Sequence, residues 1–354
     1  MEHLKIKQVR IVGTGLIGTS IALGLAQQGI GLELSDKNQS SLDLAKDLLS
    51  LSLREAEADV VVIATPPGDS FEALLSEYKR NPQAVFIDVG STKYNLIQKI
   101  ESLSDFAVHF VGTHPMAGRE FSGASHAQAD LFQGRAWILT PNSRTDSNAM
   151  GLAVEIVQML GATPYQMSAQ EHDQLLALIS HLPQIISTTL AASLERSGRE
   201  AKLAGQGLRD MTRIAESSPE LWSQILLDNR EFVLNSLAQF ELEIEAFREA
   251  LQLSSKEKIE EIFRQGNAGR AKVSGKHGAL PRNYRYLMVV IKDEPGALSR
   301  LFNECASIQA NIEELSIEHS PGQLTGLITL AFSSEDATRV QEHLVKKNWK
   351  VHLR

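Results

Sequence analysis

Short apolar runs recur along the first half of the chain, separated by segments with helical periodicity. Between residues 8 and 167 these runs lack strict alternation of apolar and polar positions. Strands that are buried on both faces have this pattern, because helices cover both sides of a parallel sheet. We therefore expect residues 1–167 to form a doubly wound α/β domain, with strands in QVRIVGTG, LELSD, DVVVIATPP, AVFIDVG, AVHFVGTHP, AWILTP and TPYQM.

The pattern changes at residue 168, where apolar positions take up helical spacing. Ser168 followed by Glu171 is typical of a capping box at a helix N-terminus. Pro183 lies inside the helical pattern that follows, so we expect it to free the carbonyl group of Ile179 and kink the helix. Residues 168–265 are predicted to be all-helical, and the long apolar-rich segment at 221–251 suggests packing against a partner subunit, at least as a homodimer.

The C-terminal part has a third pattern. Residues 266–283 are rich in glycine and basic residues and are predicted to be a linker. From Tyr284 to the end, the segments read strand, helix, strand, strand, helix, strand. That order predicts a ferredoxin-like domain at 284–354, with an antiparallel sheet and two helices on one face.

Composition excludes several classes of protein. The net charge is −8 and basic residues are scattered, which argues against a nucleic-acid partner. The single cysteine, Cys305, excludes an internal disulfide framework and fits a reducing compartment. We find neither a signal peptide nor a run of ~18 apolar residues that would span a membrane, so a cytoplasmic location is expected.

Three glycines join the first predicted strand to the first predicted helix. Gly13, Gly15 and Gly18 have the G-x-G-x-x-G spacing of a Rossmann-type dinucleotide-binding turn. They allow a tight turn, close approach of the backbone to a pyrophosphate, and close packing of helix on strand. A purely structural turn would also explain the glycines alone. The other expected cofactor contacts in this loop are Thr14, Leu16 and Ile17.

An acidic residue follows the second predicted strand. Asp36 lies at about the distance from the glycines at which a carboxylate reaches the ribose hydroxyl groups. It would repel the 2′-phosphate of NADP, so NAD is the expected cofactor, although Lys37 softens that preference. The alternative is that Asp36 caps the next helix.

Further polar residues follow the later strands. In a doubly wound sheet the carboxyl ends of the strands face the ligand, so Thr65, Pro66, Ser91 and His114 should line one crevice. Many loop histidines have no role beyond a surface or hydrogen-bonded position. At this edge, however, a neutral imidazole with an ordinary pKa of ~6.5 can accept a proton from a substrate hydroxyl group.

The helical domain holds two clusters of candidate residues. His172, Asp173 and His181 suggest a metal site, but nine residues of an ideal helix rotate by ~900°, which puts the histidines on opposite faces. They are expected to shape a pocket or simply to pack. Arg213 is expected to bind a substrate carboxylate with Asp210 positioning it, unless the two form only a surface pair.

The motifs together resemble the prephenate dehydrogenase family from about residue 8 to 265, through VGTGLIGTSIA, DVGSTK, GTHPMAG, EHD, SHLP and RDMTRIA. The resemblance implies NAD-dependent oxidative decarboxylation of prephenate to 4-hydroxyphenylpyruvate. His114 would accept a hydrogen bond from the ring hydroxyl group, Ser91 would help to hold it, and Arg213 would bind a carboxylate. Residues that would shape or gate the pocket are His172, Asp173, Glu120, His181, Asp210 and Trp222.

One departure from the family pattern leaves the substrate open. Several members carry a second histidine after SHLP, where this chain has Gln184. Prephenate and its amino analogue arogenate therefore both remain candidates.

The C-terminal domain resembles an ACT domain through KDEPGALSRLF at 292–302. The resemblance implies an effector such as tyrosine or another aromatic amino acid, or else a purely oligomerising module. The implied effector residues are Asp293, Pro295, Gly296, Ala297, Leu298 and Asn311, the last at the start of the following strand.

Two other functions are less consistent with the sequence. One is another hydroxyacid dehydrogenase of the 3-hydroxyisobutyrate type, which is disfavoured because the helical segment carries no matching catalytic lysine motif. The other is a noncatalytic sensor of nucleotide and amino acid, which the motifs around His114 argue against.

Overall fold

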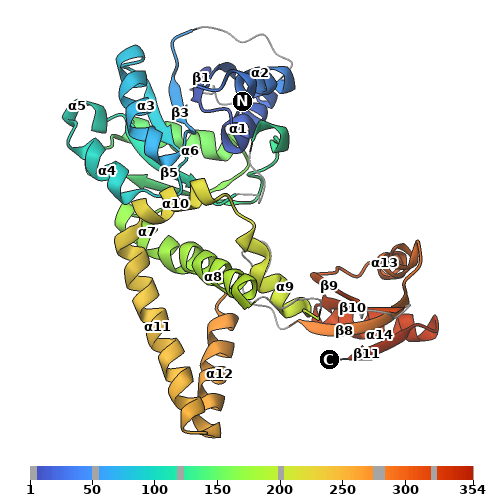
Figure 1. Ribbon diagram of the computed structural model, residues 1–354. Helices are drawn as coiled ribbons and strands as arrows, with labels where there is room; N and C mark the ends of the chain where they lie inside the picture. Colours follow the sequence, from blue (N-terminus) through green and yellow to red (C-terminus); the bar gives the residue numbers. More distant parts are fainter. Residues whose placement is uncertain are drawn as a thin grey trace. The chain divides into compact units, whose positions relative to one another are not determined.

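The computed structural model describes residues 6–49, 56–117, 123–197, 203–273, 284–319 and 325–353. The chain divides into two compact units, residues 1–246 and 247–354 (Figure 1). The first unit contains a seven-stranded sheet and most of the long helices, and the second contains a four-stranded sheet.

The large sheet has the strand order β2-β1-β3-β4-β5-β6-β7. Its strands are β1 (Gln8–Val12), β2 (Gly31–Ser35), β3 (Val60–Ile63), β4 (Val85–Asp88), β5 (Phe110–Pro115), β6 (Ala136–Pro141) and β7 (Thr163–Gln166). The first five are parallel, whereas β6 runs antiparallel to β5 and β7 runs parallel to β6. The expectation of a wholly parallel sheet was therefore wrong at this edge. The described residues between β5 and β6 form a 3-10 turn, η1 (Ala124–His126), in place of the helix that a parallel crossover uses.

Helices cover both faces of this sheet, as the apolar strand pattern predicted. Buried side chains of α1 (Leu16–Gln27) and α6 (Ser147–Met159) pack on one face. Those of α3 (Pro67–Arg80), α4 (Tyr94–Glu101) and α5 (Ser104–Ala107) pack on the other. A further helix, α2 (Gln39–Leu49), leads from β2 to β3. The order reverses between β1 and β3, which is where such sheets bind ligands.

One long helix leads out of the sheet domain. It comprises α7 (Ala169–Leu176), a π-helical turn η2 (Ala177–His181) and α8 (Leu182–Ser197), and the predicted capping box of Ser168 and Glu171 is present. The predicted irregularity before Pro183 is thus a π turn. By length and composition alone, Ala169–Arg196 is the one described helix that could cross a membrane. This is weak evidence, because the helix carries polar side chains that are buried in the protein.

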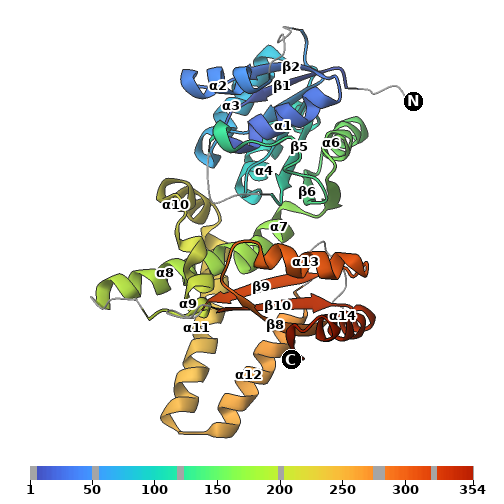
Figure 2. The same cartoon turned by 90° about the vertical axis from the view of Figure 1, so that its right-hand side faces the viewer.

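Shorter helices follow: α9 (Gln206–Thr212), the 3-10 turn η3 (Arg213–Ala215) and α10 (Pro219–Asp228). Then come α11 (Arg230–Gln252) and α12 (Lys256–Ala271) (Figure 2). The rings of Phe247 at the end of α11 and Phe263 on α12 meet edge to face, with their centroids 6.1 Å apart. Helix α12 continues through Gly266 and Gly269, into the stretch that was expected to be a linker. The rest of that stretch, 274–283, lies outside the described residues.

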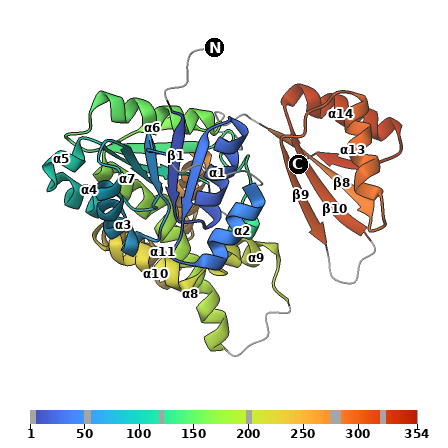
Figure 3. The same cartoon turned by 90° about the horizontal axis from the view of Figure 1, so that it is seen from above.

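The second sheet has the order β11-β8-β10-β9, and all its pairs are antiparallel. Its elements are β8 (Arg285–Lys292), α13 (Ala297–Ser307), β9 (Glu314–His319), β10 (Thr325–Phe332), α14 (Ser334–Lys346) and β11 (Lys350–Leu353). They occur in the expected order, and both helices lie on the same face of the sheet (Figure 3). Asn311 precedes β9 by three residues and does not begin it.

Candidate active site

The glycine loop after β1 has the geometry that a dinucleotide requires. Gly13 has a φ of +101°, and a Cβ atom there would lie 2.4 Å from the main-chain oxygen of Ala64. A Cβ atom on Gly18 would lie 1.9 Å from the oxygen of Gly13, so helix and strand meet too closely for any side chain. At Gly15 nothing lies within 4 Å of the added atom, which leaves the backbone open to a ligand. The three glycines thus fit the three roles inferred from their spacing.

Asp36 holds this loop in place. Its Oδ2 atom accepts hydrogen bonds from the main-chain N–H of Thr14 at 2.6 Å and from its hydroxyl group at 2.9 Å. Its Oδ1 atom accepts one from the N–H of Asn38. The side-chain oxygen of Asn38, not of Asp36, accepts from the first N–H groups of α2. A carboxylate has about four acceptor positions, so Asp36 retains one for a ribose hydroxyl group. Thr14 is fully buried, and its hydrogen bonds to Asp36 stabilise the loop.

The next strands bring their ends to the same edge. Thr65 follows β3, where its hydroxyl group lies 3.2 Å from that of Ser70, and Pro66 precedes α3. Lys37 pairs with Asp69 at 3.2 Å, and both side chains are exposed. Ser91 lies partly buried in the loop between β4 and α4. The parallel register of β1, β3, β4 and β5 therefore gathers the predicted residues, while Glu120 lies outside the described residues.

His114 ends a hydrogen-bonded chain that crosses from the sheet to α7. Its Nδ1 atom lies 2.9 Å from Nε2 of His172, and Nδ1 of His172 lies 2.7 Å from Oδ1 of Asp173. His172 and Asp173 are almost fully buried. The sequence placed these residues in one pocket without predicting this chain.

The partners of Asp173 fix the direction of the chain. Its carboxylate also accepts from the main-chain N–H groups of Lys93 at 2.9 Å and Tyr94 at 2.8 Å, at the start of α4. An ionised carboxylate only accepts, so Nδ1 of His172 donates to it. When His172 carries only this one ring proton, its Nε2 atom accepts from Nδ1 of His114. This leaves the Nε2 lone pair of His114 as an acceptor for a substrate.

A buried ion pair lies beneath His114. Lys93 is fully buried, and its ammonium group bonds to Asp88 and to the main-chain oxygen of Thr113 at 2.7 Å. Asp88 also accepts from the N–H of Thr113, which fixes the residue directly before His114. Burial, followed by the charges of His172, Lys93 and His181, holds the pKa of His114 well below its ordinary value of 6.5. The acceptor form is therefore favoured at neutral pH.

His181 lies in the same group of side chains. Its ring is 6.0 Å from that of Trp222 in an edge-to-face arrangement, and its Nδ1 atom is 3.0 Å from the amide nitrogen of Asn229. Burial lowers the pKa of His181 to about 4, against the raising effect of Asp173. The expectation that His172 and His181 lie on opposite faces assumed an ideal helix, and the π turn changes that rotation. The two side chains also interact electrostatically, since His172 lowers the pKa of His181.

Arg213 and Asp210 lie on the exposed side of this region. Arg213 begins η3, and Asp210 accepts from the side chain of Gln206 at 2.8 Å. Gln184 is buried, and its amide nitrogen donates to the main-chain oxygen of Ile214 at 2.8 Å. Gln184 thus ties α8 to the turn that carries Arg213.

Comparison with known families agrees with this geometry. A model described as the prephenate dehydrogenase nucleotide-binding domain matches residues 8–166, and one described as the prephenate dehydrogenase dimerization domain matches residues 168–265. The chain belongs to the prephenate dehydrogenase family. It is therefore an NAD-dependent oxidoreductase.

Individual members of the prephenate dehydrogenase family are similar over most of their length. The prephenate dehydrogenase of Bacillus subtilis (strain 168) is 30% identical over 96% of this chain and 95% of its own. The crystal structure of prephenate dehydrogenase from A. aeolicus, in complex with hydroxyphenyl propionate and NAD+, has a TM-score of 0.71 and 28% identity, over 77% of this chain and 100% of that one. Synechocystis arogenate dehydrogenase has a TM-score of 0.64 and 26% identity, over 75% and 99%.

Some residues of this prephenate dehydrogenase family site were missed by the sequence reasoning. Lys93 and Asp88 lie in DVGSTK, where only Ser91 was singled out. A lysine and an aspartate five residues apart at a strand end were a usable signal. Asn229 had none, because an amide between two helices carries no recognisable pattern.

Proposed function

We propose that this enzyme oxidatively decarboxylates prephenate to 4-hydroxyphenylpyruvate with NAD, the dehydrogenase step of tyrosine biosynthesis. The observation that carries the proposal is the chain from Asp173 through His172 to His114. It presents a neutral imidazole acceptor at the edge of the nucleotide-binding sheet. Such an acceptor is what a hydroxyl group needs when its carbon loses a hydride.

The glycine loop, Asp36 and His114 have different roles in the proposed reaction. Gly13, Gly15 and Gly18 would hold the pyrophosphate of NAD and Asp36 its ribose. Bound NAD supplies the hydride acceptor. His114 accepts the hydrogen bond of the ring hydroxyl group and supports the carbonyl character that develops at that carbon. Loss of carbon dioxide then gives an aromatic ring, which makes the step effectively irreversible.

Arg213 is proposed to bind a substrate carboxylate. The support is its position on a turn that Gln184 fastens to α8, the same continuous helix that carries His181. Arogenate is the alternative substrate, because Gln184 stands where several family members have histidine, and a known arogenate dehydrogenase has a similar fold.

The experiment is NADH absorbance after purified protein is mixed with NAD and prephenate. Arogenate and 3-hydroxyisobutyrate are run alongside under the same conditions. A signal with prephenate supports the proposal. A larger kcat/KM with arogenate than with prephenate would show that arogenate is the preferred substrate. A response to 3-hydroxyisobutyrate alone would indicate instead a hydroxyacid dehydrogenase of the 3-hydroxyisobutyrate type. No signal with any of the three would favour the noncatalytic sensor.

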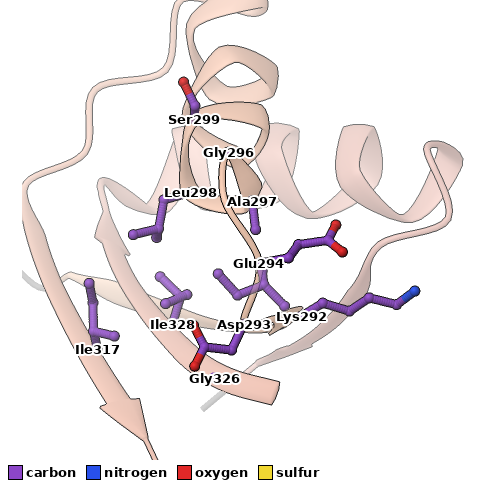
Figure 4. Close-up of a pocket in the computed structure, with 11 residues that line it drawn as sticks. Lys292, Asp293, Glu294, Gly296, Ala297, Leu298, Ser299, Ile317, Gly326 and Ile328 are labelled. Carbon is purple, nitrogen blue, oxygen red and sulfur yellow. The ribbon is translucent and has the colours of Figure 1, made fainter. Parts of the chain in front are cut away.

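We further propose that residues 284–354 form an ACT domain that binds an aromatic amino acid, with residues 1–167 and 168–265 as the nucleotide-binding and helical domains. The support is the ferredoxin-like strand order and a cavity of about 320 Å³ beside the start of α13. Leu298, Ile317 and Ile328 lie on its apolar side, with the carboxylate of Asp293 nearby (Figure 4). Gly296 and Ala297 also line it. Pro295 and Asn311 are not among its lining residues.

A homodimer is proposed for the assembled enzyme. The match to the family's dimerization domain supports it. So do large apolar side chains that are more than half exposed along α11, namely Leu234, Leu242 and Ile244.

A further inference from the structure

Asn229 lies between α10 and α11 and is 2% exposed. Its amide nitrogen is 2.9 Å from the main-chain oxygen of Asp173 and 3.0 Å from Nδ1 of His181. A main-chain oxygen can only accept a hydrogen bond. Asn229 therefore turns its NH₂ group toward Asp173, since its own oxygen at that distance would be repelled. The second hydrogen of the same NH₂ group is directed at His181.

The tautomer of His181 follows from this contact. An Nδ1 atom that accepts a hydrogen bond carries no hydrogen of its own, so a neutral ring holds its proton on Nε2. The ring is neutral at physiological pH, because burial lowers the pKa of His181 to about 4. His181 is therefore a hydrogen-bond donor at Nε2, whereas His114 is an acceptor at that atom.

The position of Asn229 is fixed from the sheet domain. Its neighbour Asp228 accepts from the hydroxyl group of Thr92 at 2.5 Å, and the main-chain oxygen of Asp228 accepts from Asn95 at 2.5 Å. The oxygen Oδ1 of Asn229 is buried and has no hydrogen-bond partner among the described residues. An unpaired buried acceptor destabilises a fold. Stability alone therefore does not account for an asparagine here.

We propose that Asn229 is a positioning residue that locks His181 as an Nε2–H donor toward a carboxylate or keto oxygen of the substrate. Asp173 then determines the hydrogen-bonding roles of both histidines, His114 as an acceptor and His181 as a donor. Its carboxylate orients His114 through His172, and its main-chain oxygen orients His181 through Asn229. The inference deepens the proposed function and rests on it for the substrate.

The first test needs no substrate. Long-range ¹⁵N–¹H spectra of the ¹⁵N-histidine-labelled full chain report which ring nitrogen carries the proton, and His181→Gln assigns the signal by its loss. We expect an unprotonated Nδ1 and a protonated Nε2 for His181. Asn229→Asp replaces the donor with an acceptor, so the proton should move to Nδ1 and the pH at which His181 titrates should rise. A proton on Nδ1 in the unaltered protein would overturn the proposal.

The second test is kinetic. Without a fixed donor the substrate loses one hydrogen bond to a charged or carbonyl oxygen, so Asn229→Asp should raise KM about 10- to 100-fold with little change in kcat. Asn229→Leu, of similar volume, covers the case in which the aspartate variant does not fold, and should also raise KM. In a His181→Gln background neither change should raise KM further.

The outcomes separate this inference from the proposed function. Equal increases of KM in both backgrounds, or an unaltered KM in both single variants, would overturn the role of Asn229. If no dehydrogenase substrate gives turnover, the proposed function fails, whereas the spectra still decide the tautomer of His181.

Discussion

At the scale of single residues, the environment of His114 decides how the reaction depends on pH. Burial and the charges of His172, Lys93 and His181 lower the pKa of His114. Since the neutral ring is the acceptor, kcat/KM should rise as pH increases through that lowered pKa and be level above about pH 6.5. An imidazole with its ordinary pKa would put this rise near 6.5, and the buried environment of His114 moves it lower. A profile from about pH 4 to pH 8 checks this, and a midpoint at or above 6.5 would contradict it.

Replacing His114 separates its chemistry from binding. His114→Asn removes the acceptor at Nε2 and should lower kcat about 10²- to 10⁴-fold with little change in KM, because the group acts mainly in the transition state. Steady-state kinetics with NAD in excess measure both constants. His352→Asn, at an exposed position on β11, is the matched control and should retain full activity. An unchanged kcat in His114→Asn would remove the residue from the mechanism.

The sequence could predict two kinds of site residue: those that belong to a motif with a fixed spacing, and those that follow the end of a strand. Gly13, Gly15 and Gly18 follow a pattern, and His114 follows from the rule that strand ends meet at one edge. Which ring nitrogen of His114 donates and which accepts could not be predicted, because this depends on residues 58 positions and more away along the chain. Asn229 acts only through such a contact, so nothing in its local sequence reveals it.

At the scale of elements, a buried charged cluster joins β1, β2 and α3. Arg10 is 4% exposed, binds Glu77 with two hydrogen bonds of 2.6 and 2.8 Å, and binds Glu33 at 2.5 Å. Arg10→Ala leaves the buried Glu77 without its cationic partner and should cost about 3 to 5 kcal/mol of unfolding free energy. Urea denaturation measures this.

The control for the Arg10 cluster lies in the same group of side chains. Arg80 also binds Glu33, at 2.7 Å, but about half of its side chain is exposed. Arg80→Ala should therefore cost less than about 1 kcal/mol. Equal losses in the two variants would show that burial does not set the strength of this cluster.

Element type followed from the sequence more reliably than element direction. Apolar runs predicted every strand of the large sheet, but a run buried on both faces reads the same in either direction. The reversal of β6 therefore depended on the connection after β5, which carries no strong helical pattern. The irregularity before Pro183 was predictable, because a proline ring cannot fit a regular helix. Its form as a π turn, and the approach of His181 to Asp173, were not.

At the scale of the whole molecule, the site and the proposed regulatory pocket belong to separate compact units, 1–246 and 247–354. The A. aeolicus structure aligns over its entire length with 77% of this chain, so about a quarter of this chain has no counterpart there. The chain in that structure, which is in complex with hydroxyphenyl propionate and NAD+, therefore lacks a counterpart of that quarter.

This separation makes a deletion informative. The chain lacking residues 284–354 should retain prephenate dehydrogenase activity but lose its response to tyrosine or another aromatic amino acid, because the cavity beside α13 is removed. Initial rates with and without each amino acid, measured on the full chain and the deletion variant, test this. In the full chain, Asp293→Asn alters a carboxylate at the cavity without removing any element, and should weaken the response while leaving kcat unchanged. If the deletion variant is still inhibited by the amino acid, the effector binds at the active site, where an aromatic amino acid would compete with the substrate for Arg213.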